Sequence, residues 1–273
     1  MPLSIAQLAT KHGIKPLKKY GQNFIYDETL CDKISRYAQI NETSNVLEIG
    51  PGPAGLSRSI LKMNPAKLTA IETDERCINL LKEVQLFYPK LKIIHADALR
   101  VNLSDITNGK VDIIANLPYN IGCKLLTNWL NQIEYVNAIT VMLQKEVVER
   151  IVSRPNSKNY GRISIFSQIL CHTEKCFDVT RNAFYPKPKV DSAIVRLLPK
   201  EHLPPKEVLC LVEKITRHAF SSRRKVLKSS LKKIIPDIDL LYQKFEFNDK
   251  IRCEDLSPDD YLGMANFIIN LNN

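Results

Sequence analysis

Apolar residues in the first two-thirds of the chain follow two alternating patterns. Short, nearly continuous apolar runs rich in β-branched residues, typical of strands buried in a parallel sheet, occupy residues 45–50, 68–72, 91–96 and 111–115. Between them, residues 56–63 and 75–87 carry apolar side chains at spacings of three and four, the period of a helix. Pro65 and Pro89 follow these segments and would end the helices. The alternation predicts an α/β fold of the doubly wound, Rossmann-like kind.

The pattern changes near residue 200. Residues 138–143 predict a fifth strand, and residues 191–198 predict a late strand inserted at an edge of the sheet. Pro204 and Pro205 then interrupt the chain, and beyond them helical periodicity takes over, in residues 209–217, 225–234 and 259–271. The sequence therefore predicts an α/β domain over residues 1–199 and a small all-helical C-terminal domain over residues 200–273.

The charge balance points to an anionic partner. The 39 Lys and Arg against 29 Asp and Glu give a formal net charge of +10, which suits nucleic acid or an acidic membrane surface and does not choose between them. No apolar run approaches the roughly 20 residues that span a bilayer. The N-terminus also lacks the apolar core of a secretion signal. We therefore expect a protein that is neither exported nor inserted in membranes.

The cysteines indicate the compartment. They are seven in number, scattered, and form no CxxC pair, which suggests free thiols in a reducing, cytoplasmic environment. Cys171, His172 and Cys176 come nearest to a metal-ligand cluster, but no fourth ligand is close in sequence. No metal is expected.

Three glycines directly follow the first predicted strand. Gly50, Gly52 and Gly55 form a GxGxxG pattern that opens the next helix, where the backbone can approach a ligand closely. Glu72 ends the second strand, where a carboxylate can accept two hydrogen bonds from a ribose diol. NAD and S-adenosylmethionine would both use this arrangement. These residues alone leave open dinucleotide binding, methyl-donor binding, and a glycine turn that binds nothing.

Two further polar residues favour the methyl donor. Asp97 follows the third strand and Asn116 the fourth, so both lie at the carboxyl edge of the sheet, where ligands bind in such folds. The Asp97 carboxylate could accept a hydrogen bond from an adenine amino group. The alternative is that Asp97 only caps a helix or turn.

The tetrapeptide Asn116-Leu117-Pro118-Tyr119 suggests the chemistry. An adenine N6 is a poor nucleophile until acceptors hold its hydrogens, and the Asn116 side-chain oxygen and the Leu117 carbonyl could supply two of them. Pro118 would stiffen the turn, and Tyr119 offers a face on which a flipped base can stack. Positioning would dominate catalysis, so no His or Cys nucleophile is needed. The alternative is an ordinary turn at the end of a strand.

With these residues in place, the chain closely resembles the ribosomal RNA adenine N6,N6-dimethyltransferases over almost its whole length. The matching segments are residues 19–24, 48–52, 116–119 and 184–192, together with Glu72 and Asp97. The resemblance implies that Asn23 and the backbone of Ile25 meet the methionine end of S-adenosylmethionine. It also implies that Phe184 is a second stacking face for the target base. Phe220, followed by Arg223, Arg224 and Lys225, resembles the start of the family's RNA-facing helices.

The chain departs from the family pattern in two places. A glycine is expected at or near position 54, where the chain has Ala54, and Ile25 stands where leucine is commoner. The first departure bears on the geometry of the cofactor loop.

A basic stripe in the C-terminal part would suit RNA. No Asp or Glu occurs between Arg217 and Lys233. The candidate RNA-binding residues are Arg217, Arg223, Arg224, Lys225, Lys228 and Lys232, which could neutralise several phosphates. Without an RNA substrate the same stripe would be a solvated face.

The resemblance implies an enzyme that dimethylates two adjacent adenosines in the 3′-terminal hairpin loop of small-subunit ribosomal RNA. We expect its partner to be an assembling 30S subunit, and a monomer would suit docking on so large a particle. A close alternative is a large-subunit RNA methylase of the antibiotic-resistance type. A ribosome-assembly factor that acts mainly by binding is another, and a nicotinamide-dependent oxidoreductase a third. DNA adenine methylases commonly carry Asp-Pro-Pro-Tyr or Asn-Pro-Pro-Tyr instead of Asn116 to Tyr119.

Overall fold

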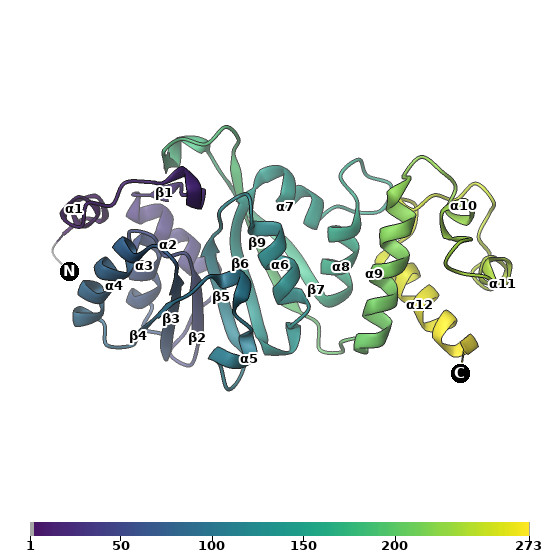
Figure 1. Cartoon of the computed structure of the whole chain (residues 1–273), viewed down its shortest axis with the longest axis horizontal. Helices are drawn as coiled ribbons and strands as arrows, with labels where there is room; N and C mark the ends of the chain where they lie inside the picture. The colour runs from purple at the N-terminus through teal and green to yellow at the C-terminus, as the bar shows by residue number, and fades with distance from the viewer. Residues whose placement is uncertain (1–2, 273) are drawn as a thin grey trace. The chain divides into compact units, whose positions relative to one another are not determined.

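The computed structural model describes residues 3–272 and contains a sheet of seven strands in the order β4-β3-β2-β5-β6-β9-β7 (Figure 1). In chain order these strands are β2 (Asn45–Ile49), β3 (Lys67–Glu72), β4 (Leu91–His95), β5 (Val111–Asn116), β6 (Val136–Gln144), β7 (Cys171–Val179) and β9 (Ser192–Pro199). The first five pair in parallel, and β9 runs antiparallel to β6. The predicted strands and the Rossmann-like α/β class are confirmed.

Helices connect the strands as the apolar periodicity predicts. The two expected between the first strands are α3 (Gly55–Lys62) and α4 (Glu75–Phe87). The remaining helices are α1 (Ile5–Lys11), α2 (Glu28–Tyr37), α5 (Leu103–Ile106), α6 (Gly122–Leu130), α7 (Lys145–Ile151), α8 (Arg162–Leu170), α9 (Lys206–Ser221), α10 (Leu227–Leu231), α11 (Ile238–Lys244) and α12 (Pro258–Asn272). Short 3₁₀ turns are η1 (Lys18–Tyr20), η2 (Ala98–Arg100), η3 (Ile133–Tyr135) and η4 (Arg181–Ala183).

One predicted strand has a different position in the sheet. β9 was expected at an edge, but it lies between β6 and β7, and β7 is the edge strand. The burial patterns give the reason. Five of the eight positions of β9 are buried, whereas most positions of β7 are exposed or half-buried, as suits a strand with only one neighbour.

The strand order reverses at β2. From β2 the chain moves outward through β3 to β4, and it then returns to place β5 on the other side of β2. The loops that follow β2 and β5 therefore diverge, which opens a crevice at the carboxyl ends of these two strands. Gly50 and Leu117 are the first residues after these strands.

A second, small pair of strands joins two distant segments. β1 (Phe24–Ile25) is antiparallel to β8 (Phe184–Tyr185), with Phe24 opposite Tyr185 and Ile25 opposite Phe184. Phe24, Ile25 and Phe184 are buried in the apolar core. The pairing therefore attaches the N-terminal segment to the loop that precedes β9.

The chain divides into two compact units, and it passes between them three times. The first comprises residues 1–148 and 174–199, and the second residues 149–173 and 200–273. The predicted boundary after residue 199 is one of these passages, but residues 149–173 belong to the second unit. They do so because α8 packs against α9 and α12, and because the Tyr160 hydroxyl donates to the Leu256 carbonyl at 2.9 Å.

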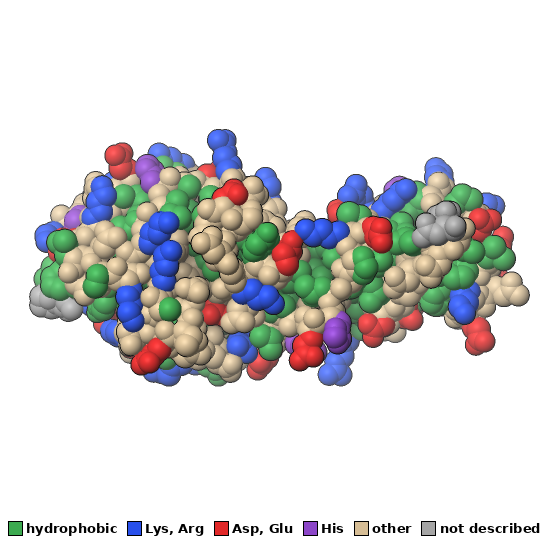
Figure 2. All heavy atoms as spheres, turned by 90° about the horizontal axis from the view of Figure 1, so that it is seen from below, with side chains coloured by type: hydrophobic (Ala, Val, Ile, Leu, Met, Phe, Trp, Pro, Cys, Tyr) green, Lys and Arg blue, Asp and Glu red, His purple; other side chains and the backbone are tan. Residues whose placement is uncertain are grey.

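The positive charge is not gathered in a single patch on the face drawn in Figure 2, where Lys and Arg side chains alternate with Asp and Glu. Within residues 3–272, no helix has the length and apolarity that crossing a membrane requires.

Candidate active site

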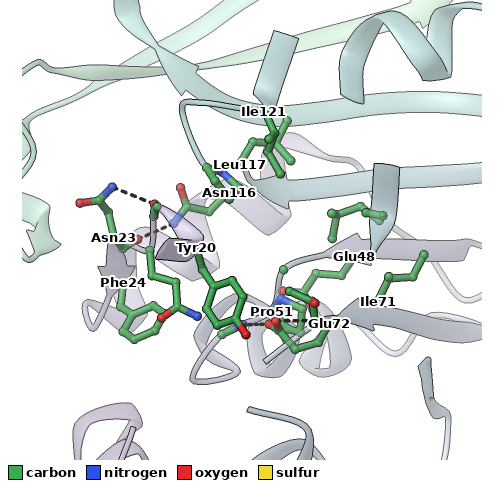
Figure 3. A pocket seen from close by; sticks show the side chains of 18 of the residues that line it. Tyr20, Asn23, Phe24, Glu48, Pro51, Ile71, Glu72, Asn116, Leu117 and Ile121 are labelled. Atoms are coloured by element: carbon green, nitrogen blue, oxygen red, sulfur yellow. Dashed lines mark hydrogen bonds between the residues drawn. The ribbon is translucent and has the colours of Figure 1, made fainter. Parts of the chain in front are cut away.

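A cavity of about 320 Å³ lies at the carboxyl ends of the parallel strands. It brings together every residue that the sequence predicts for the cofactor and the tetrapeptide, and Figure 3 shows how several of them lie. These lining residues are Asn23, Ile25, Gly50, Gly52, Glu72, Asp97, Asn116, Leu117, Pro118 and Tyr119. Of the predicted catalytic residues, Phe184 is the one that does not line it.

The glycine loop bends sharply around the end of β2. Gly50 and Gly52 have φ values of +65° and +54°, which residues with a side chain rarely adopt. A Cβ added at Gly52 would lie 3.0 Å from Phe24 Cε1, whereas a Cβ at Gly50 would meet nothing within 4 Å. The loop is therefore closely packed at Gly52 and leaves open space beside Gly50, which a ligand can fill.

Ala54 explains the departure from the family pattern. Its φ is +64°, the conformation for which a glycine is expected, and the left-handed region costs an L residue roughly 1 to 2 kcal/mol. Its methyl group is 0% exposed and belongs to the apolar core, which recovers about 0.8 kcal/mol. Burial of the methyl group offsets much of the backbone cost, so the loop keeps its shape without glycine.

Glu72 is held rigidly at the end of β3. Its carboxylate accepts backbone N–H bonds from Gly52 at 3.1 Å, Thr73 at 2.8 Å and Asp74 at 2.9 Å. Burial raises the pKa of Glu72, while these three N–H donors oppose the rise. These three bonds use both acceptor positions of Oε1 and one of Oε2, so Oε2 retains a position for a hydroxyl donor of a ribose diol.

Glu48 is a cavity residue that the sequence analysis did not single out. Its side chain is 1% exposed, and Oε2 has no hydrogen-bond partner among the described residues. Burial raises the pKa of this carboxyl to about 8. The available signal was a single acidic residue inside the apolar run 45–50. A cationic ligand in the cavity would compensate the charge of Glu48 when it ionises.

Asp97 both caps a 3₁₀ turn and lines the cavity. Its Oδ1 accepts the Leu99 N–H at 3.0 Å and so caps η2. Its side chain is half-exposed and lines the cavity, and Oδ2 lies 3.7 Å from Arg100 Nε. Capping and ligand recognition are therefore compatible at this residue.

Asn116 is oriented by the N-terminal segment. Its Nδ2 donates to the Asn23 carbonyl at 3.0 Å (Figure 3), and the Asn23 side chain donates to the Gly21 carbonyl at 3.3 Å. This bond uses one of the two amide hydrogens of Asn116 and fixes the orientation of the amide, whose oxygen can accept a hydrogen bond from a ligand.

Tyr119 is anchored by a residue that the sequence analysis included only within a matching segment. The Tyr119 hydroxyl and the buried Ser192 hydroxyl lie 2.6 Å apart. Burial raises the pKa of Tyr119, so the phenol stays neutral. The bond holds the hydroxyl end of the ring at Ser192 and restricts the orientation of the ring, whose face could stack on a base.

Phe184 is buried and does not line the cavity. Its side chain is 5% exposed and belongs to the core beneath the β1–β8 pair. The exposed aromatic residue of this strand is its neighbour Tyr185. Successive residues of a strand point to opposite faces, which explains why one ring is buried and the next is not.

The predicted RNA-binding residues fall into two groups. Arg217 pairs with Glu213 at 2.7 Å, and Lys228 with Asp239 at 2.6 Å. Arg223 donates to Glu254 at 2.7 Å and to the carbonyls of Lys158 and Ser157 at 2.9 and 3.0 Å. Among the predicted RNA-binding residues, Arg224, Lys225 and Lys232 are exposed and form no ion pair within residues 3–272.

Arg223 consequently has a structural role within the second unit. All three of its guanidinium nitrogens are used to join residues 157–158 to Glu254. Its guanidinium is thus engaged in contacts within the second unit. No three His, Cys, Asp or Glu side chains between residues 3 and 272 gather as they would around a metal ion.

Comparison with known proteins agrees with this geometry. The family model "Ribosomal RNA adenine dimethylase" matches residues 14–270. The chain is similar to "Ribosomal RNA small subunit methyltransferase A" of Xanthobacter autotrophicus, with 39% identity over 96% of this chain and 92% of the relative. It is similar to the protein of the same name from Agrobacterium fabrum, with 40% identity over 94% of each chain.

Solved structures extend the comparison. A dimethyladenosine transferase from Plasmodium falciparum superposes with a TM-score of 0.77 at 26% identity, over 91% of this chain and 98% of that one. The 23S rRNA methyltransferase ErmE gives a TM-score of 0.71 at 22% identity, over 90% of this chain and all of that one. The second likeness concerns the fold alone.

Glu48→Gln tests the protonation of the buried carboxyl. Between the unfolded pKa near 4.5 and the folded pKa of about 8, folded protein holds a proton that the unfolded chain has lost. The free energy of unfolding should therefore fall as pH rises through this range and level off above it. In Glu48→Gln this component should disappear. Urea unfolding of both proteins from pH 4.5 to 9, without ligand, measures the difference, and parallel profiles would contradict a protonated Glu48.

Proposed function

The chain belongs to the ribosomal RNA adenine dimethylase family, and we propose that it transfers methyl groups from S-adenosylmethionine to N6 of two adjacent adenosines in the 3′-terminal hairpin loop of small-subunit ribosomal RNA. The products would be N6,N6-dimethyladenosines, made as part of small-subunit biogenesis. The observation that carries the proposal is the orientation of the Asn116 amide. Asn116 ends β5, Asn23 holds its amide, and the ring of Tyr119, anchored by Ser192, lines the same cavity.

The cavity residues fit S-adenosylmethionine. Glu72 would accept a hydrogen bond from the ribose diol and Asp97 one from the adenine amino group, while Asn23 and Ile25 would hold the methionine end. The open space at Gly50 leaves room for a ligand close to the backbone, and the unpaired Oε2 of Glu48 suits a ligand that carries positive charge. When bound, S-adenosylmethionine supplies a methyl already activated on a sulfonium, so the chain needs no nucleophile of its own.

The tetrapeptide would hold the methyl acceptor. The Asn116 side-chain oxygen and the Leu117 carbonyl would accept the two N6 hydrogens, which favours a more tetrahedral and nucleophilic nitrogen. Tyr119, fixed by Ser192, would stack on the flipped adenine. A rigid site of this kind acts by positioning, and its groups need no shifted general base. The stacking role proposed for Phe184 would require its buried ring to become accessible.

The second unit would hold the RNA backbone through Arg224, Lys225 and Lys232, which are exposed and free of ion pairs in the described part of the chain. We further propose that the substrate is an assembling subunit, that the enzyme acts as a monomer, and that it works in the cytoplasm. Sedimentation of the purified protein, alone and with subunits, tests the monomeric state and the association.

Asn116→Ala should abolish most of the activity. Removing one oriented hydrogen-bonding group from a catalytic site typically lowers the rate by about 100-fold or more. Methyl transfer from labelled S-adenosylmethionine to unmethylated small subunits, and separately to large subunits, should be followed by mass spectrometry of the nucleosides. Asn131→Ala, an exposed asparagine at the end of α6, is the control and should retain wild-type activity.

Other results of that measurement would replace the proposal. Transfer to large subunits alone would identify the resistance-type enzyme. Tight binding to small subunits without transfer to either would identify an assembly factor that acts by binding. Equal activity of the Asn116 and Asn131 variants would contradict the role assigned to the tetrapeptide.

Adjacent arginines separate RNA binding from stability. Arg224→Ala should weaken RNA binding and lower its salt dependence by about one phosphate contact, without changing the melting temperature. Arg223→Ala should lower the free energy of unfolding by about 2 kcal/mol, because its charge-assisted bonds to residues 157–158 and Glu254 are lost. Thermal unfolding and RNA titration at several salt concentrations measure both effects. A melting temperature lowered by Arg224→Ala and not by Arg223→Ala would reverse the assignment.

A further inference from the structure

An exposed aromatic ring stands beside the cavity and has no role in the function proposed above. Tyr185 is 62% exposed, more than Phe87 at 54% or Tyr37 at 39%, although it neighbours the buried Phe184. Its ring lies 6.4 Å from that of Tyr26 and tilts 51° from it. A single exposed ring needs no explanation by itself, so the meaning of this one depends on its support and its surroundings.

The ring is presented on a rigid support. The β1–β8 pair sets Tyr185 opposite Phe24. Phe24 lines the cavity, as do its chain neighbours Asn23 and Ile25. Pro186 and Pro188 follow Tyr185 and restrict the backbone, because each proline fixes its own φ. Little conformational entropy would be lost when a partner stacks on a ring held in this way.

The surroundings of the ring are positively charged. Residues 181–190 contain Arg181, Lys187 and Lys189 and no Asp or Glu. Lys187 and Lys189 are exposed, and neither ammonium group has an ion pair within residues 3–272. Arg181 differs, because its guanidinium donates to the Lys189 carbonyl at 3.3 Å and so steadies the loop.

The same segment leads directly to the catalytic tetrapeptide. Asp191 accepts the Arg181 N–H through its side chain at 2.9 Å, and the next residue, Ser192, anchors Tyr119. Phe24, which pairs with Tyr185, lines the same cavity as Tyr119, so an RNA strand that places one base against Tyr119 could reach Tyr185. Aromatic rings flanked by unpaired cations are the usual platform for unpaired bases, because the ring takes the base and the cations take the phosphates.

We propose that Tyr185, with Lys187 and Lys189, is a second contact surface for single-stranded RNA, which stacks an unpaired base of the substrate loop other than the methylated adenosine. This inference rests on the proposed function, since it assigns a further part of the same substrate. Charge complementarity favours RNA over a protein, whose apolar anchor would not require two free lysines.

The test measures RNA affinity and cofactor affinity separately. A fluorescently labelled RNA hairpin with two adjacent adenosines in its loop is titrated by anisotropy, and S-adenosylmethionine by calorimetry. Tyr185→Ala should raise the Kd for the hairpin about 5- to 100-fold and leave the cofactor Kd unchanged, and Tyr185→Phe should bind as the wild type does. Phe87→Ala, which removes a ring of similar exposure from α4, is the matched control and should change neither Kd.

The two lysines are tested by the salt dependence of RNA binding. Replacing Lys187 and Lys189 together by Gln should reduce the slope of log Kd against log salt by about 1.4, the value for two phosphate contacts to a single strand. Methylation kinetics then add a second readout. Tyr185→Ala should raise KM for small subunits more than it lowers kcat, because the ring binds the substrate without touching the reacting atoms.

Three outcomes would overturn the proposal. Hairpin affinity of Tyr185→Ala equal to that of Phe87→Ala would remove the ring from the RNA surface. A loss in Tyr185→Phe as large as in Tyr185→Ala would exclude stacking. Weaker binding to whole subunits with unchanged binding to the hairpin would identify a ribosomal protein as the occupant. In each case, wild-type methylation of small subunits would show that the proposed function itself stands, and its absence would show that it has failed independently.

Discussion

The reversal of strand order at β2 is the constraint on which the site depends. Parallel strands place all their carboxyl ends at one edge, and the loops after β2 and β5 must diverge there because β3 and β5 lie on opposite sides of β2. The crevice that results needs no special residues to form. What the sequence adds is chemistry at each strand end, with glycines after β2, Glu72 at the end of β3 and Asn116 at the end of β5.

The N-terminal segment converts this crevice into a cavity with oriented groups. The Asn23 carbonyl accepts the Asn116 amide, and β1 pairs with β8, which leads to Ser192 and its bond to Tyr119. Each contact joins residues far apart in the chain. Together they connect the N-terminal segment to the residues proposed to bind the methyl donor and to those proposed to bind the target adenine. Any change that displaces β1 should therefore disturb binding and positioning together.

Local pattern predicted much of the fold and the cofactor side of the site. The apolar periods located the parallel strands and the helices between them, and the lining of the cavity contains every residue predicted for the donor. Several features escaped it. Glu48 is hidden inside an apolar run, β9 depends on a later edge strand, and Phe184 alternates with Tyr185 on faces that only the pairing with β1 defines.

The sequence by itself determined the elements, their order, and the types of polar residue at the strand ends, because helical and strand periods act over a few residues and parallel strands share one polarity. The tertiary structure decided which polar side chains are engaged by other parts of the protein and which remain accessible to a ligand. Arg223 is consumed by Glu254 and two carbonyls, Arg224 beside it is free, and Tyr119 is fixed by Ser192. Such pairings depend on which distant residues fold against one another, and local periodicity carries no information about them.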